Sequence, residues 1–251
     1  MIIWKWIRIR RCNMKRWCYL LIFAFLFSSL SAEEGKNIIS VLQEKGYSLH
    51  SYRCKFIMLG KVKPLPPKTE GKVLFEEGKG LFVEAVFMFE NGVKGKNILR
   101  INDKEFITYD SLSNQGIKID LEKVKAKVGN RYPFINPLGK HDLRNPFILK
   151  GLEPGTVKLE GEDKTHYIFT AVMYPDPSLG IVVKAYTAKL WVDKNSGLLK
   201  KLQVRERKKV IYTMEFFDFE TNITIPEEEF LVKLPENAQI LDITESWLKK
   251  E

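Results

Sequence analysis

The residue types that most often carry out chemistry are scarce in this chain of 251 residues. Its three histidines are His50, His141 and His166, and none has a histidine or cysteine at the spacing of metal ligands. His141 precedes Asp142, but no Gly-x-Ser-x-Gly motif supplies a nucleophile for this pair. We therefore interpret His141 as a loop residue, with catalysis by the pair as the alternative. The sequence predicts no catalytic residue, no metal site and no cofactor, and thus a protein that is not an enzyme.

Two further residues could be reactive because of where they lie. Cys54 occurs alone after residue 32, so it forms neither an internal disulfide nor a cysteine-based zinc site. It lies in the strand-like run YRCKFIML, where a small buried side chain is the usual role of cysteine. Glu84 interrupts an apolar strand. We expect it to face solvent, and the alternative is a buried carboxylate that needs a partner.

The N-terminus has the three parts of a secretory signal peptide. Six basic and no acidic residues precede an apolar run at 20–27, and small residues follow it. We predict a signal peptide over residues 1–32, with cleavage after either Ser31 or Ala32. Residues from Met14 onward form a complete signal peptide by themselves, so Met14 is an alternative start. The apolar stretch Trp17–Leu30 has 14 residues, fewer than the roughly 20 that span a bilayer, and an uncleaved anchor is the weaker alternative.

Removal of the signal peptide changes the charge of the protein. Without its six basic residues, 35 basic residues stand against 31 acidic ones, so the net charge falls from +10 to +4. A charge of this size requires no nucleic-acid partner. The sequence thus indicates an exported protein, which we place in the periplasm and expect to be a monomer.

The sequence predicts that residues 33–251 form one domain with many strands and few helices. Apolar spacing predicts a helix over 36–45, and Gly46 would end it. Alternating apolar residues with Gly- and Asn-containing turns predict strands near 49–60, 70–77, 80–90, 95–101, 104–109, 116–120, 155–161, 165–173, 185–194, 198–207 and 209–219, with a short piece near 229–234. Residues 121–152 contain three prolines and predict short helices and loops. The fold class is α+β, with one large curved antiparallel sheet of about eleven strands.

Such a sheet exposes more apolar surface than its few helices cover. In the hairpin 190–204, Leu190 and Val192 alternate with Trp191, and Leu202 and Val204 share a side across the turn. Uncovered apolar area costs about 2.5 kcal/mol per 100 Å². Curling of the sheet on itself, a protein partner or a bound apolar ligand can each provide the cover.

The C-terminal third resembles the closing strands of the outer-membrane lipoprotein carrier (LolA/LolB-like) superfamily. The resemblance consists of a strand that ends in Val-Asp, a Gly-containing turn, a strand with an early lysine, an aromatic strand and then Asn, Ile-Pro, Phe and Pro. These features are carried by Val192, Asp193, Gly197, Leu198, Lys200, Phe216, Asn222, Ile225, Pro226, Phe230 and Pro235. The order of elements over residues 36–243 is similar as well.

The resemblance implies an incomplete antiparallel barrel with helices across its open side and an apolar interior that binds acyl chains. Two departures argue against a true lipoprotein carrier. The strand 81–89 lacks the arginine with which the carrier closes its lid, and the insert around 130–147 is long and rich in proline. The chain is therefore similar to an uncharacterised branch of the superfamily.

The resulting prediction is a non-enzymatic binding protein that holds an acyl chain or another hydrophobic ligand, with a role in lipid or lipoprotein traffic to the outer membrane. Its partner would be a lipid or an acylated protein. The predicted lining residues are Phe87, Phe89, Trp191, Tyr212, Met214 and Phe216. The alternative is a periplasmic sensor or interaction module that binds a membrane-bound regulator protein.

Overall fold

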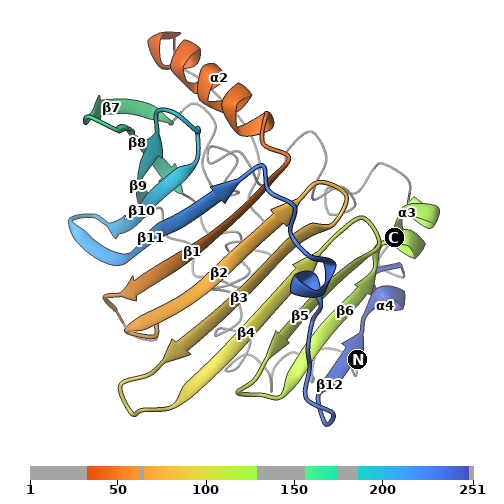
Figure 1. Cartoon of the computed structure of the whole chain (residues 1–251). Coiled ribbons are helices and arrows are strands. Elements are labelled where there is room, and N and C mark those ends of the chain that lie inside the picture. Colours follow the sequence, from red (N-terminus) through yellow and green to blue (C-terminus); the bar gives the residue numbers. More distant parts are fainter. Residues whose placement is uncertain (1–32, 63–64, 129–155, 174–185, 249–251) are drawn as a thin grey trace.

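All strands in the described part of the chain belong to one sheet. The computed structural model describes residues 33–62, 65–128, 156–173 and 186–248, and its sheet has twelve strands (Figure 1). They are β1 (Ser51–Gly60), β2 (Lys68–Glu76), β3 (Gly80–Met88), β4 (Lys94–Ile101), β5 (Glu105–Asp110), β6 (Gln115–Asp120), β7 (Lys158–Glu162), β8 (His166–Met173), β9 (Tyr186–Asp193), β10 (Leu199–Glu206), β11 (Lys209–Thr221) and β12 (Gln239–Asp242).

The topology is an unclosed, curved sheet, as the sequence predicted. The spatial order is β12-β6-β5-β4-β3-β2-β1-β11-β10-β9-β8-β7, so β12 and β7 are its two edges. Every neighbouring pair is antiparallel except β12 and β6, which are parallel. Long-range pairing of β1 with β11 joins the two halves, with Phe56 opposite Phe216 and Met58 opposite Met214.

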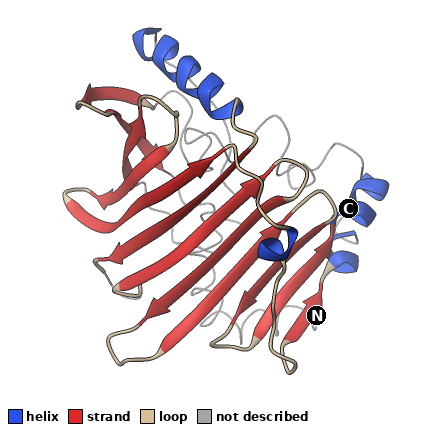
Figure 2. Ribbon diagram, viewed as in Figure 1, coloured by secondary structure: helices blue, strands red, loops and turns tan. Residues whose placement is uncertain are grey.

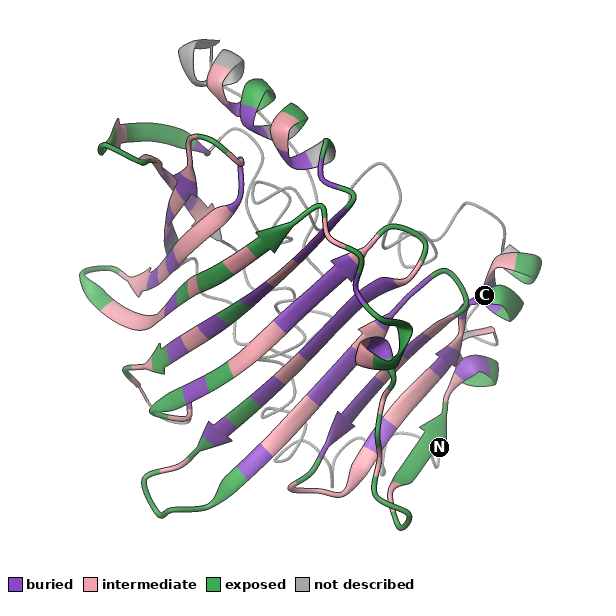
Figure 3. Cartoon of the chain, in the orientation of Figure 1, coloured by how far each residue is buried: buried purple, intermediate pink, exposed green. Residues whose placement is uncertain are grey.

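Strand alternation divides the sheet into two faces. We call the face that carries Cys54 and Phe56 the inner face, and the face that carries Arg53 and Lys55 the outer face. Cross-strand register carries this division through the sheet, for example from Cys54 to Val73 in β2. Burial follows the central strands, while the hairpin tips are exposed (Figure 3).

The helices lie at the margins of the sheet (Figure 2). They are α2 (Glu33–Tyr47), α3 (Leu121–Val128) and α4 (Thr244–Leu248), with a 3-10 turn, η4 (Glu227–Phe230). α2 packs Ile39 and Leu42 into the inner-face cluster, and α3 adds Leu121 and Val124. Among the described residues, no helix combines the length and the apolar character that crossing a bilayer requires.

The turn between β9 and β10 fixes the position of α2. Gly197 has a φ of +71°, and a Cβ there would collide with the carbonyl oxygen of Leu42 in α2. The Lys45 ammonium donates a hydrogen bond of 2.7 Å to the carbonyl oxygen of Lys194. A glycine at this turn therefore allows the end of α2 to approach the hairpin closely.

The C-terminal segment 222–238, which we call the strap, crosses the outer face (Figure 1). Its Ile225 and Phe230 are fully buried in a second apolar cluster with Leu74, Phe82, Ile98 and Tyr109 of the sheet. The Ile225 N–H donates to the Glu76 carboxylate at 2.8 Å, and the Lys79 ammonium donates to the Ile225 carbonyl at 2.6 Å. The strap therefore covers part of the outer face.

The short strand predicted near 229–234 is not formed, which corrects that prediction. Pro226 begins the 3-10 turn η4, and the strap runs across the sheet rather than along a neighbouring strand. Its apolar side chains pack on the face of the sheet, so its backbone takes no part in the ladder. The last strand is instead β12, at residues 239–242, which makes twelve strands where about eleven were expected.

Candidate hydrophobic site on the inner face

The inner face carries a continuous cluster of buried apolar side chains that spans most of the sheet. Its buried cluster takes side chains from β1 to β6 and from β8 to β11. Tyr167, Tyr186, Tyr212, Phe216 and Phe219 are partly buried and pack against this cluster. Aromatic side chains therefore make up about half of the partly buried residues that pack against the cluster.

Register and alternation place most of the predicted lining residues on this face. Met214 is fully buried in the cluster, and Tyr212 and Phe216 alternate with it along β11. Phe87 lies opposite Thr69 of β2 and has the same parity as the buried Ala85. Phe89 follows the end of β3, and its ring meets that of Phe87 edge-on, with centroids 5.5 Å apart.

Trp191, predicted with them, lies on the outer face, which corrects its placement. Leu190 and Val192 beside it belong to the inner cluster, so the alternation of β9 turns Trp191 away. The ammonium groups of Lys189 and Lys201 each lie 5.5 Å from the centroid of its ring. The alternation of Leu190, Trp191 and Val192 in the sequence is consistent with this placement.

Two aromatic rings of the inner face pack flat against glycines of neighbouring strands. A Cβ on Gly71 would lie 2.6 Å from the ring of Phe56, and a Cβ on Gly95 would collide with the ring of Phe87. Glycine at these positions therefore lets the rings lie close to the sheet.

Two buried hydroxyls interrupt this apolar surface. Thr69 and Thr108 have the inner-face parity and exposed fractions of 2% and 4%. Within the described part of the chain, neither Oγ1 has a hydrogen-bond partner. A buried polar atom without a partner costs about 1–3 kcal/mol of folding free energy.

The phenol of Tyr212 is kept neutral by its surroundings. Burial raises its pKa above the ordinary value, and the nearby Tyr186 adds to this effect. The Tyr212 side chain therefore presents an uncharged phenol at neutral pH.

A cation lies beside the inner cluster near α2. The Lys200 ammonium is 3.7 Å from the centroid of the Phe219 ring. Burial lowers its pKa, while the carboxylate of Asp193 and the thiol of Cys54 act in the opposite direction. Lys200 lies at an irregularity of the β9–β10 register, between Leu199, which pairs with the inner-facing Val192, and Lys201, which pairs with the outer-facing Trp191.

Cys54 has the buried role that the sequence predicted. Its exposed fraction is 2%, and burial raises its pKa to about 12, with the positive charge of Lys200 opposing the rise. A thiol that remains protonated is a poor nucleophile.

The remaining polar candidates form local contacts. Glu84 faces outward, as expected, and its carboxylate pairs with Lys96 at 2.6 Å. His50 is exposed and contacts the Glu77 carboxylate at 3.0 Å. His141 and Asp142 lie outside the described residues. No group of three or more potential metal ligands occurs within residues 33–62, 65–128, 156–173 and 186–248.

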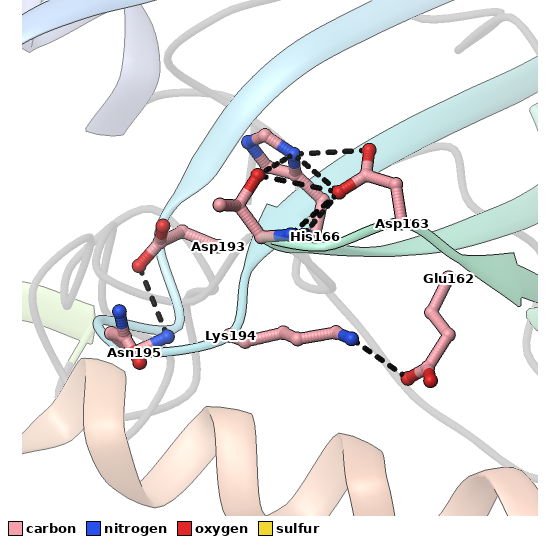
Figure 4. Close-up of polar contacts among 7 residues, drawn as sticks. Glu162, Asp163, His166, Asp193, Lys194 and Asn195 are labelled. Carbon is pink, nitrogen blue, oxygen red and sulfur yellow. Dashed lines mark hydrogen bonds and ion pairs between the residues drawn. The ribbon is translucent and has the colours of Figure 1, made fainter.

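His166 belongs to a polar group at the hairpin tips (Figure 4). The Asp163 carboxylate accepts hydrogen bonds from the backbone N–H groups of Thr165 and His166, and these lower its pKa to about 2. The imidazole Nδ1 of His166 lies 3.1 Å from the same carboxylate, and Lys194 pairs with Glu162 at 2.9 Å. These contacts connect neighbouring turns, and we interpret their role as structural.

A separate cavity of about 320 Å³ opens on the outer face between the strap and β2 to β4. Its walls carry charges of both signs, and its floor is formed by Phe82 and Ile98. The residues that line it are Lys72, Phe82, Glu84, Lys96, Ile98, Glu228, Glu229, Leu231 and Lys233.

Comparison with known proteins gives similarity in fold. No family model and no curated protein matches the chain. An uncharacterised conserved protein from Thermus thermophilus is similar over 83% of this chain and 99% of its own, at 14% identity and a TM-score of 0.48. The Mycobacterium tuberculosis lipoprotein LppX is similar over 77% and 99%, at 13% identity and a TM-score of 0.38.

A protein of the LolA superfamily from Nitrosomonas europaea is also among the similar structures. It covers 80% of this chain and 99% of its own, at 10% identity and a TM-score of 0.34. At these identities the likeness concerns the fold and does not extend to a ligand or an activity.

Proposed function

We propose that this protein is an exported, non-enzymatic binding protein that holds an acyl chain or another hydrophobic ligand against the inner face. The observation that carries the proposal is the apolar surface that runs through ten neighbouring strands and ends in partly exposed aromatic side chains. The order of motifs that resembles the lipoprotein carriers supports the same function.

Binding would be driven by removal of apolar surface from water, at about 0.8 kcal/mol for each buried CH₂ group. Phe87, Tyr212, Met214 and Phe216 are the proposed lining residues, with Phe89 at the edge. Because such a surface offers few directional contacts, it would accept acyl chains of different kinds.

The proposed setting is the periplasm, after cleavage of residues 1–32. The mature domain would comprise residues 33–251, act as a monomer and take its ligand from a membrane lipid or an acylated protein. Traffic of lipids or lipoproteins to the outer membrane would use a protein of this kind.

The test is native mass spectrometry of protein purified without detergent from the periplasm of a bacterial host that expresses the full precursor. A processed N-terminus and a stoichiometric acyl species, identified by lipid extraction, are the expected results. Displacement of the neutral fluorescent probe Nile red by lipids would extend the test to ligands that the host lacks. Retention in the cytoplasm would contradict export, and failure to bind Nile red or any lipid would contradict the binding function.

Matched substitutions on β11 distinguish binding at the inner face from nonspecific hydrophobic binding elsewhere on the protein. Phe216 lies on the inner face, whereas its neighbour Phe217 lies on the outer face and is 42% exposed. Phe216→Ser is expected to weaken Nile red binding several-fold, and Phe217→Ser is expected to leave it unchanged. Equal effects of the two substitutions would argue against binding at the inner face.

The alternative is an interaction module for a membrane-bound regulator protein. The outer-face cavity favours this candidate because it combines an apolar floor with lysines and glutamates that suit a polypeptide. Stable capture of one membrane protein by lipid-free protein, and its loss in a Lys233→Glu variant, would support this alternative over lipid binding.

A further inference from the structure

The lysines near the turn between β9 and β10 differ in whether a carboxylate neutralises them. Lys189 pairs with Glu160 at 2.8 Å, Lys194 with Glu162 at 2.9 Å and Lys201 with Glu215 at 2.5 Å. Lys200 has no hydrogen bond or ion pair with any residue in the described ranges, and its ammonium lies above the ring of Phe219. It is therefore a cation without a counter-charge at hydrogen-bond distance within that part of the chain.

The closest acidic group, Asp193, is occupied by the turn. Its Oδ1 accepts hydrogen bonds from the N–H of Asn195 at 3.1 Å, the N–H of Ser196 at 2.7 Å and the Ser196 hydroxyl at 2.8 Å. Burial raises the pKa of Asp193, but these hydrogen bonds and the charge of Lys200 outweigh it, so the pKa is lowered overall. The charge of Asp193 thus acts on Lys200 without a direct hydrogen bond, and the three N–H donors of the Lys200 ammonium remain available.

The ammonium lies on the ligand side of the sheet. Phe219, over which it is placed at 3.7 Å from the ring centroid, packs against the inner cluster. A half-buried ammonium is poorly hydrated, so an anion brought to it would gain a charge-assisted hydrogen bond at little further cost in desolvation.

We propose that Lys200 binds the anionic group, a carboxylate or a phosphate, of an amphiphilic ligand whose acyl chain lies along the inner face of β11. This inference rests on the proposed function. It defines the ligand class as anionic amphiphiles, as opposed to neutral ones such as alcohols, esters or glycerides.

The dimensions of β11 agree with such a ligand. From Phe219 to Tyr212 the strand advances seven residues, which at about 3.3 Å each gives roughly 23 Å. The acyl chain of one leaflet occupies about half of the roughly 30 Å hydrocarbon core of a bilayer. A chain of about 15 Å that starts at Lys200 would therefore pass Phe216 and end near Met214, before it reaches Tyr212.

The experiment measures displacement of Nile red, a neutral probe, from protein exported as the full precursor and freed of lipid. The competitors share a twelve-carbon chain and differ in the head: dodecanoate, dodecyl phosphate and dodecanol, all below their micellar concentrations. The expected result is that at least one anion binds about tenfold more tightly than dodecanol, a ratio that corresponds to about 1.4 kcal/mol. The anion that binds more tightly identifies the head as carboxylate or phosphate.

Lys200→Met should reduce this preference to about twofold or less without abolishing dodecanol binding, since it retains an apolar stem over Phe219. The matched control is Lys201→Met, which removes a neighbouring lysine from the outer face and should retain the full preference. Lys200→Arg, which keeps the charge, should retain most of the preference for anions. This variant tests the role of the charge if the methionine variant does not fold.

Three results have distinct meanings. Equal affinity of wild-type protein for dodecanol and both anions would overturn the role of Lys200 and leave the proposed function intact. Competition by inorganic phosphate as strong as that by dodecyl phosphate would also overturn it, because the site would then recognise a free anion. Failure to bind Nile red or any twelve-carbon competitor would overturn the proposed function itself.

Discussion

Replacing Phe230 with alanine would remove the largest side chain by which the strap is attached to the outer face. The ring has no exposed surface and packs in a cluster with Leu74, Phe82 and Tyr109. Truncation of a fully buried phenylalanine costs about 3–5 kcal/mol in unfolding free energy. For a domain of this size, each kcal/mol lowers the melting temperature by about 2–4 °C, so we expect a decrease of roughly 6–20 °C.

The assay is urea and thermal unfolding followed by circular dichroism, with Leu231→Ala as the matched control. Leu231 is the next residue and is 47% exposed, so its truncation should cost less than about 0.5 kcal/mol. Hydrogen exchange at β12 gives a second measurement, because this strand is held against β6 at the end of the strap. Equal stability of the two variants, with unchanged protection of β12, would refute the view that Phe230 holds the strap.

Three further predictions address other parts of the molecule. Cys54 should resist alkylation in the folded protein and react after unfolding, because burial raises its pKa to about 12. The rate of modification is measured by mass spectrometry, and modification of the folded protein at the rate of a free thiol would contradict this prediction. Gly71→Ala should destabilise by about 1–3 kcal/mol, because its Cβ would meet the Phe56 ring, whereas Gly161→Ala, with open space around it, should be nearly neutral in urea unfolding. Asp163 has a folded-state pKa of about 2, below its ordinary 3.8, so it adds stability above that ordinary value and loses it as the pH falls towards 2. Asp163→Asn should flatten this part of the stability profile, and an unchanged acid-side slope would exclude the contribution.

Local patterns in the sequence predicted the strands because alternation is a property of each strand alone. Leu190, Val192, Leu202 and Val204 were expected to share a face, and all four are buried in the inner cluster. Glu84 was expected to face outward, and it does so with Lys96 as its partner. In both cases the information needed was contained within a few neighbouring residues.

The strap and β12 were missed because their structure depends on distant residues. Ile225 and Phe230 have no strand-like alternation, and their burial arises from the outer-face side chains of β2 to β5. β12 forms a parallel pair with β6, more than a hundred residues earlier in the chain. Such pairing leaves no mark on the four residues of the strand itself.

The outer face of the sheet contributes packing and ion pairs that stabilise the fold, whereas the proposed binding function lies on the inner face. On the outer face, the strap buries its own apolar side chains, and ion pairs such as Lys96 with Glu84 and Lys201 with Glu215 neutralise the neighbouring charges. On the inner face, Thr69 and Thr108 carry hydroxyls, and Lys200 an ammonium, without a partner among the described residues. Groups of this kind lower the stability of the folded protein, and a ligand that supplies a partner for the half-buried Lys200 ammonium would recover part of that free energy on binding. Within the described residues, a buried polar atom without a partner occurs on the outer face as well, at the Nε of Arg100, and the ammonium of Lys200 is the group that the proposed ligand would reach.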